Sequence, residues 1–105
     1  MNILLDESVP WPVHKLIIGH NCTSVQRRGW KGSRNGALLP LAEAEFDLFI
    51  TSDQNLRYQQ NLAGRKIAIL ELSTNKLRQI VAAADDLRAA MAAIKPGEFK
   101  RLQIP

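Results

Sequence analysis

Short apolar runs alternate along the chain with longer stretches of helical periodicity, and this alternation restricts the fold more than any other feature. Strands separated by helices favour a parallel sheet covered on both faces. We therefore predict an α/β fold, a three-layer α/β/α sandwich around a mostly parallel sheet of four to five strands. The predicted strands are Ile3–Leu5, Cys22–Val25, Phe46–Ser52, Lys66–Leu72 and an edge strand at Phe99–Ile104.

The longest helix is predicted from Lys76 to Ile94, where apolar residues recur at steps of three and four. Thr74 or Asn75 is its expected cap, and Pro96 and Gly97 stop it. This Ala-rich helix is expected to pack on the sheet, and any exposed stripe on it offers a surface for a partner or a second copy in a homodimer.

Three shorter helices are predicted between the strands. The first has Ser8 as its N-cap, two prolines in its first turn and Gly19 at its end. The second covers Ala37–Glu45, where Pro40 either delays the regular helix or kinks it. The third covers Asp53–Leu62.

Length and composition fit one globular domain spanning residues 1–105, with 46% hydrophobic residues. No apolar stretch approaches the roughly 20 residues that a bilayer span needs, and Met1 leads directly into a strand-like segment. We therefore expect a cytoplasmic protein without membrane contact. Cys22 is the single cysteine beside two histidines, too few for a usual zinc site. The net charge of +4 favours a polyanion or an acidic protein as partner.

Acidic residues follow two of the predicted strands directly. Asp6 and Glu7 follow the first strand, and Asp53 follows the third. Ligands of parallel sheets gather at the carboxyl ends of the strands, so these acids converge if the two strands are near neighbours. Converging carboxylates repel one another, and a Mg²⁺ ion with oxygen ligands relieves that repulsion and can activate water at a phosphodiester. The alternative is that Asp53 only caps the following helix.

The two acidic segments also carry a resemblance. The segments "ILLDESVP" and "FITSDQNL" resemble the small, toxin-like branch of the PIN-like domain superfamily, which pairs an N-terminal "LLDE" and a nearby proline with a later "TxDxD". The resemblance extends to about the fourth strand. It implies a Mg²⁺- or Mn²⁺-dependent endoribonuclease, commonly the toxin half of a toxin-antitoxin pair that a small DNA-binding antitoxin holds inactive.

The resemblance assigns the catalytic acids to particular positions. Asp6 and Asp53 match the metal-binding acids, and Glu7 fits the second acid of the opening motif. Two departures concern the metal: Asn35 and Asn55 stand where the family usually has acids. Amide oxygens can ligate a cation but bring no charge, so metal binding is expected to be weaker. A substitute ligand from the second helix would be Glu43.

A basic segment after the second strand suggests contact with RNA. Its cations can follow a phosphate backbone while its tryptophan stacks on an unpaired base. The alternative is a solvated loop with the tryptophan packed on the core. The candidate nucleic-acid-binding residues are Arg27, Arg28, Trp30, Lys31 and Arg34, together with Arg57, one helical turn after Asp53.

Two other readings remain open. A PIN-like fold that has lost catalysis would only bind RNA or an antitoxin, as the two asparagines allow. A receiver-type signalling domain also places an acidic pair after its first strand and a phosphoacceptor Asp after its third. In receivers a Lys follows the fifth strand, whereas Lys95 here follows a segment that is predicted to be helical.

Overall fold

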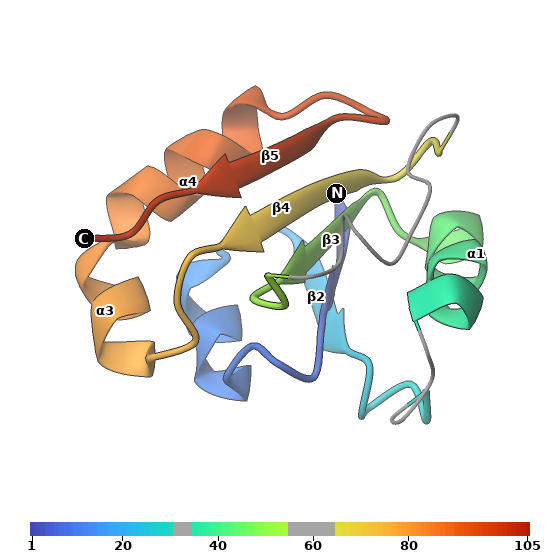
Figure 1. The fold of residues 1–105 in the computed structure, drawn as a ribbon, viewed down its shortest axis with the longest axis horizontal. Helices are drawn as coiled ribbons and strands as arrows, with labels where there is room; N and C mark the ends of the chain where they lie inside the picture. Colours follow the sequence, from blue (N-terminus) through green and yellow to red (C-terminus); the bar gives the residue numbers. More distant parts are fainter. Residues whose placement is uncertain (31–34, 55–64) are drawn as a thin grey trace.

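A five-stranded parallel sheet forms the centre of the protein in this computed structural model, which describes residues 1–30, 35–54 and 65–105. The strand order is β2-β1-β3-β4-β5, and each neighbouring pair is parallel. This arrangement confirms the predicted α/β fold class. The strands are β1 (Asn2–Leu5), β2 (Asn21–Ser24), β3 (Leu48–Thr51), β4 (Ala68–Leu72) and β5 (Phe99–Leu102) (Figure 1).

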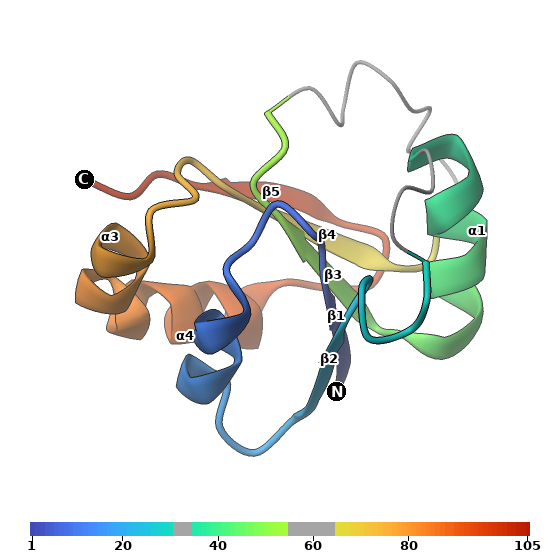
Figure 2. The same cartoon turned by 90° about the horizontal axis from the view of Figure 1, so that it is seen from below.

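Helices cover both faces of this sheet. The 3-10 helix η1 (Trp11–Leu16) and the helices α3 (Leu77–Ala82) and α4 (Ala84–Ala93) lie on one side, and α1 (Asn35–Glu45) lies on the other (Figure 2). The three layers follow from the strands, whose side chains are buried on both faces, as is typical of parallel sheets. No helix of the described residues has the length and apolar character to cross a bilayer.

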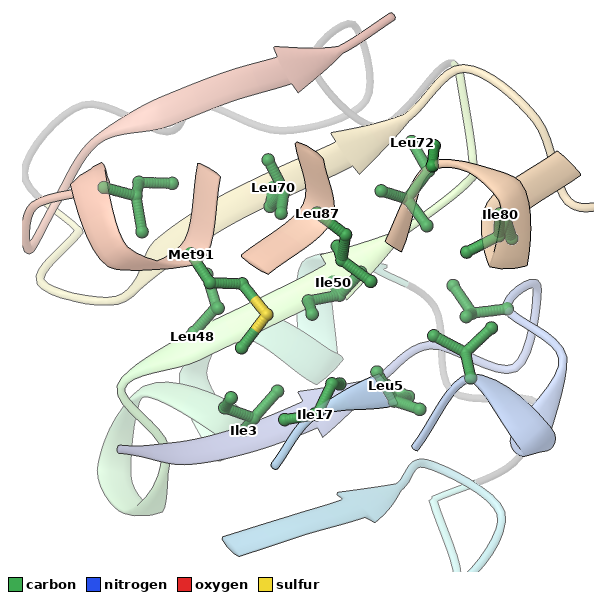
Figure 3. Packing of buried hydrophobic residues seen from close by; sticks show 14 of the residues in the cluster. Ile3, Leu5, Ile17, Leu48, Ile50, Leu70, Leu72, Ile80, Leu87 and Met91 are labelled. Atoms are coloured by element: carbon green, nitrogen blue, oxygen red, sulfur yellow. The ribbon is translucent and has the colours of Figure 1, made fainter. Parts of the chain in front are cut away.

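The larger core lies under η1, α3 and α4. Alternate residues of β1, β3 and β4 point into it, and Ile80, Leu87 and Met91 of the two helices pack on them (Figure 3). The strand residues that contribute are Ile3, Leu5, Leu48, Ile50, Ala68, Leu70 and Leu72.

A second apolar cluster lies under α1, and it fixes the register of the strands. Leu4, Phe49, Ile69 and Phe99 stand side by side on four neighbouring strands, because each is paired in register with the next. The α1 residues Leu38, Leu39 and Ala42 cover this row. A slip of one residue would turn every side chain of a strand to the opposite face, so burial of both faces specifies the pairing strongly.

The start of the first helix differs from the prediction. Ser8 caps no helix, because η1 begins after Pro10 and has no side-chain cap, and the Ser8 hydroxyl binds Asp6 instead. The Ser8 hydroxyl donates to the Asp6 carboxyl group and accepts the Ser52 backbone N–H, so both of its roles are taken up by the neighbouring strand ends. The predicted glycine turn is present, since Gly19 has a φ of +85°.

The predicted long helix is two helices. Ala83 has a φ of −102° and a ψ of 23° and separates α3 from α4. Asp85 and Asp86 occupy the first turn of α4, where the positive end of the helix dipole favours acidic side chains, so the sequence supports a second helix start there. Neither Thr74 nor Asn75 is the cap, since Lys76 holds that position without a side-chain bond.

The other boundaries shift by a few residues. Helix α1 begins at Asn35 instead of Ala37 and contains Pro40, which is exposed. Strands β3 and β4 are shorter than predicted. Phe46 follows directly after α1 and does not join β3, because its backbone nitrogen donates to the Ala42 carbonyl at 2.8 Å. Most of the helix predicted at 53–62 lies outside the described residues.

The turn before β5 provides a test of the packing. Gly97 has a φ of +76°, and a Cβ atom there would lie 2.9 Å from the Arg65 backbone oxygen. Gly19 has a similar φ of +85° but nothing within 4 Å of its Cβ position. We expect Gly97→Ala to lower the unfolding free energy by about 2–4 kcal/mol and Gly19→Ala by about 1 kcal/mol, since only the former adds a backbone clash to the left-handed strain. Urea denaturation of both variants measures the difference, and equal losses would contradict the close approach at Gly97.

Candidate functional site

The candidate site lies where the strand order reverses, at the carboxyl ends of β1 and β3. These two strands are direct neighbours, with Leu5 paired to Ile50. The backbone nitrogen of Asp6 donates to the Ile50 carbonyl at 2.8 Å, so the ladder continues to the first residue after β1. Crevices at such reversal points are where open α/β sheets bind their ligands.

Asp6 is a nearly buried carboxyl group that two hydroxyls hold in place. Its residue is 7% exposed, and its Oδ2 atom accepts bonds from Ser8 Oγ at 2.6 Å and Thr51 Oγ1 at 2.8 Å. Hydrogen bonds to a charged acceptor contribute about 1.5–3 kcal/mol each, which offsets the cost of burying the group. Within residues 1–30, 35–54 and 65–105, both side-chain hydrogen bonds of the carboxyl group are therefore made by Oδ2.

The Thr51 hydroxyl connects Asp6 with Asp53. Thr51 Oγ1 donates to Asp6 and accepts the backbone N–H of Asp53 at 3.0 Å, so one hydroxyl group separates the two residues. Ser8 makes the matching connection, because its Oγ accepts the Ser52 backbone N–H at 3.1 Å. The predicted approach of Asp6 and Asp53 is therefore present at the level of the backbone, and both residues lie at one rim.

A polar row continues from Asp6 across the sheet. Leu4, Phe49, Ile69 and Phe99 form the apolar row under α1 on four neighbouring strands. Two positions after each of them stands a polar residue, which therefore lies on the same face of the sheet. Thr51, Glu71 and Arg101 are paired in register. In spatial order from β1 to β5 the row is Asp6, Thr51, Glu71 and Arg101, and it is called the rim row below.

Glu71 and Arg101 form the second half of the rim row. Glu71 is buried, and its Oε1 atom lies 3.9 Å from Arg101 Nε. The sequence analysis named neither residue, nor Ser8 and Thr51 as parts of the site. A signal was present for two of them, because Thr51 and Glu71 are polar residues near the ends of otherwise apolar runs.

The remaining predicted acids and amides are placed differently. Glu7 is exposed in the turn after Asp6. Glu43 does not reach the rim: it pairs with Arg65 at 3.4 Å and accepts the Lys66 backbone N–H at 3.1 Å, at the edge of the sheet where β4 begins. Asn35 is the first residue of α1, and its side chain is outside the described part of the structure, as is all of Asn55.

The described part of the basic segment packs on the protein. The Arg27 guanidinium lies 4.2 Å from the Trp11 ring centroid. Arg28 forms an ion pair with Glu45 and lies over the Trp30 ring, which also meets Phe46 edge-on with centroids 6.2 Å apart. Packing of Trp30 on the core was the alternative considered from the sequence. Lys31, Arg34 and Arg57 lie outside the described residues.

The donors at the rim fit a hard divalent cation in their chemistry. Asp6, Asp53, Ser8 and Thr51 offer oxygen atoms only, which Mg²⁺ and Mn²⁺ prefer. Within residues 1–30, 35–54 and 65–105, no three His, Cys, Asp or Glu side chains converge as a metal-binding group. A Mg²⁺ ion can be held by one or two carboxylates together with several waters.

Cys22 and the histidines lie outside this site. Cys22 is half-buried in β2 beside the larger core, and burial raises the pKa of its thiol to about 11. His14 stacks on Trp11 with centroids 4.0 Å apart, and its Nδ1 lies 2.6 Å from the Trp11 carbonyl oxygen. His20 Nδ1 lies 3.0 Å from the Met1 amino group.

Comparisons of the chain with protein-family models, with curated proteins and with solved structures find no match.

The double role of Thr51 gives a testable expectation. Thr51→Val keeps the shape but leaves Asp6 with one hydroxyl donor and the Asp53 N–H without its acceptor. We expect it to lower the unfolding free energy by about 1–3 kcal/mol, the cost of unsatisfied buried polar groups. Thr51→Ser keeps the hydroxyl and serves as the control, with a loss near 1 kcal/mol for the missing methyl group. Urea denaturation compares them, and a Val variant at least as stable as the Ser variant would refute the role of this hydroxyl.

The raised pKa of Cys22 predicts slow alkylation. A pKa of about 11 against an ordinary 9.0 means about 100-fold less thiolate at pH 8 in the folded protein. We expect iodoacetamide to modify Cys22 at least tenfold more slowly in buffer than in 8 M urea, followed by mass spectrometry. Equal rates in the two solvents would show that the thiol is not protected.

Proposed function

We propose that this protein is a metal-dependent endoribonuclease-like protein that cleaves single-stranded RNA. The observation that carries the proposal is the position of Asp6 and Asp53 on either side of the Thr51 hydroxyl at the reversal point of the sheet. The motif resemblance and the net charge of +4, which favours a polyanionic substrate, support the same reading.

Asp6 and Asp53 would hold a Mg²⁺ or Mn²⁺ ion in this proposal, with Asn35 and Asn55 as the uncharged ligands that the resemblance suggests. The ion would activate a water molecule and stabilise negative charge on the phosphodiester. The Asp6 carboxyl group is already oriented before a metal ion binds, since the bonds from Ser8 and Thr51 both end on Oδ2 and restrict its rotation. Glu7, exposed in the next position, is the acid available to handle a proton at the solvent side of the rim.

The resemblance extends the proposal to a toxin held inactive by a small DNA-binding antitoxin. A short neighbouring gene for a DNA-binding protein, whose product copurifies with this chain and suppresses cleavage, would support this assignment. A homodimer and a cytoplasmic location belong to the same proposal.

Substitution of the two aspartates tests the activity. Purified protein with Mn²⁺ or Mg²⁺ is expected to cleave single-stranded RNA, and Asp6→Asn or Asp53→Asn to lower the rate at least 100-fold, because each removes a charge that the metal needs. Asp86→Asn is the matched control: this exposed acid lies on α4, on the opposite side of the sheet, and its loss should leave the rate unchanged. Gel analysis of a labelled RNA gives the rates, and calorimetry gives metal uptake.

Two other outcomes of this experiment would point elsewhere. RNA that stays intact and calorimetry without metal uptake would favour the protein that only binds RNA or an antitoxin. Phosphorylation of Asp53 by acetyl phosphate would favour a receiver domain, which shares the strand order found here. Against a receiver stands Lys95, which lies between α4 and β5 and therefore before the last strand, at the edge opposite the rim.

A further inference from the structure

Arg101 is an exposed cation at the same rim as Asp6. It lies near the carboxyl end of β5, on the α1 side of the sheet, two residues after Phe99 of the apolar row. Its side chain is 51% exposed, and within the described part of the chain its one ion pair is that with Glu71, at 3.9 Å. This distance is an ion pair and too long for a hydrogen bond, so the guanidinium donors remain available.

The other described arginines are directed elsewhere. Arg28 and Arg65 pair with Glu45 and Glu43, and both partners belong to the half of α1 near the starts of the strands. Arg27 stacks on Trp11 of η1, on the opposite side of the sheet. Arg78 and Arg88 belong to α3 and α4, also on that side. Among the described arginines, Arg101 alone therefore belongs to the face and rim of Asp6.

Glu71 lies beside Arg101 and attracts its guanidinium without covering it. The Glu71 carboxyl group is buried on the neighbouring strand, so the ion pair restrains the guanidinium from below while half of the Arg101 side chain faces solvent. A restrained guanidinium loses less conformational entropy on binding than a free one, and its planar fork suits two oxygens of one phosphate.

We propose that Arg101 contacts a phosphate group of the RNA substrate, one that is not cleaved. This inference rests on the proposed ribonuclease function and specifies how its substrate lies, across the rim row from β1 towards β5. Neighbouring strands are about 4.8 Å apart, so Arg101 stands about 14 Å from Asp6, three strands away. At that separation it cannot reach the phosphodiester that would be cleaved beside Asp6 and Asp53. Arg101 therefore acts on RNA affinity and KM, and leaves kcat unchanged.

Salt-dependent RNA binding tests this assignment. The probe is a fluorescently labelled, unstructured single-stranded RNA of 15 nucleotides, and binding is measured by anisotropy in EDTA over a series of KCl concentrations. We expect Arg101→Gln to weaken binding about fivefold to tenfold at low salt and to reduce the slope of log affinity against log salt by about 0.7, the value for one phosphate contact on a single strand. Arg101→Lys should restore most of the slope, since it keeps the charge, but only part of the affinity, since it lacks the fork.

Lys100 provides a matched control on the same strand. It precedes Arg101, points to the opposite face of the sheet, is 45% exposed and pairs with Glu98 at 3.7 Å. Lys100→Gln removes the same charge and should leave the affinity and the slope nearly unchanged. Equal losses in Lys100→Gln and Arg101→Gln would show a general charge effect and overturn the proposal, as would an Arg101→Gln variant that binds like the wild type. Urea denaturation confirms that the variants compared are folded.

The outcome also separates this inference from the ribonuclease proposal. Binding is measured without metal and without cleavage. A protein that does not cleave RNA but whose RNA binding depends on Arg101 would refute the ribonuclease proposal and support the phosphate contact. A protein that cleaves RNA and whose KM for RNA is unchanged by Arg101→Gln would refute the phosphate contact and support the ribonuclease proposal.

Discussion

The pairing register of four strands is the constraint on which the candidate site depends. Leu4, Phe49 and Ile69 form one buried row under α1 that the half-buried Phe99 extends, and burial of the inner strands on both faces opposes a shift in their register. Because side chains alternate along a strand, the next residues on the same face are forced into a second row, which is polar. The rim row is therefore a consequence of the apolar packing below it.

The sequence predicted the architecture and the position of the two aspartates at the carboxyl edge of the sheet, because both follow from local patterns. The apolar runs and their spacing indicate the parallel sheet, and acids that directly follow buried strands lie at its carboxyl edge by geometry alone. The contacts that hold these acids were not predictable in this way. Ser8 looks like a helix cap, and Thr51 looks like an ordinary strand end. Their roles depend on which residues of a distant strand lie opposite, and spacing within one segment does not contain that information.

The same limit explains the differences outside the site. The basic segment left open an RNA-binding loop or a loop packed on the core, and in its described part Arg28 has its partners on α1 and just beyond it, at Glu45 and Phe46. The uninterrupted helical periodicity from Leu77 to Ile94 hid the break at Ala83, because residues on both sides of it face the same core. Arg101 was overlooked for the opposite reason: as one cation of an edge strand it has no local signature, and only pairing with Glu71 places it on the rim.

The distance along the chain between Asp6 and Thr51, 45 residues, also determines when the site can exist during folding. The first strand can pair early with the second, but the environment of Asp6 is complete only after the chain has crossed over through α1 and inserted β3 beside β1. Parallel pairing across such long crossovers is slow, because the entropy of loop closure is lost before the stabilising contacts between the strands form. A nascent chain that has not yet added β3 therefore carries an unshielded carboxyl group, and the candidate site is complete only with the finished sheet.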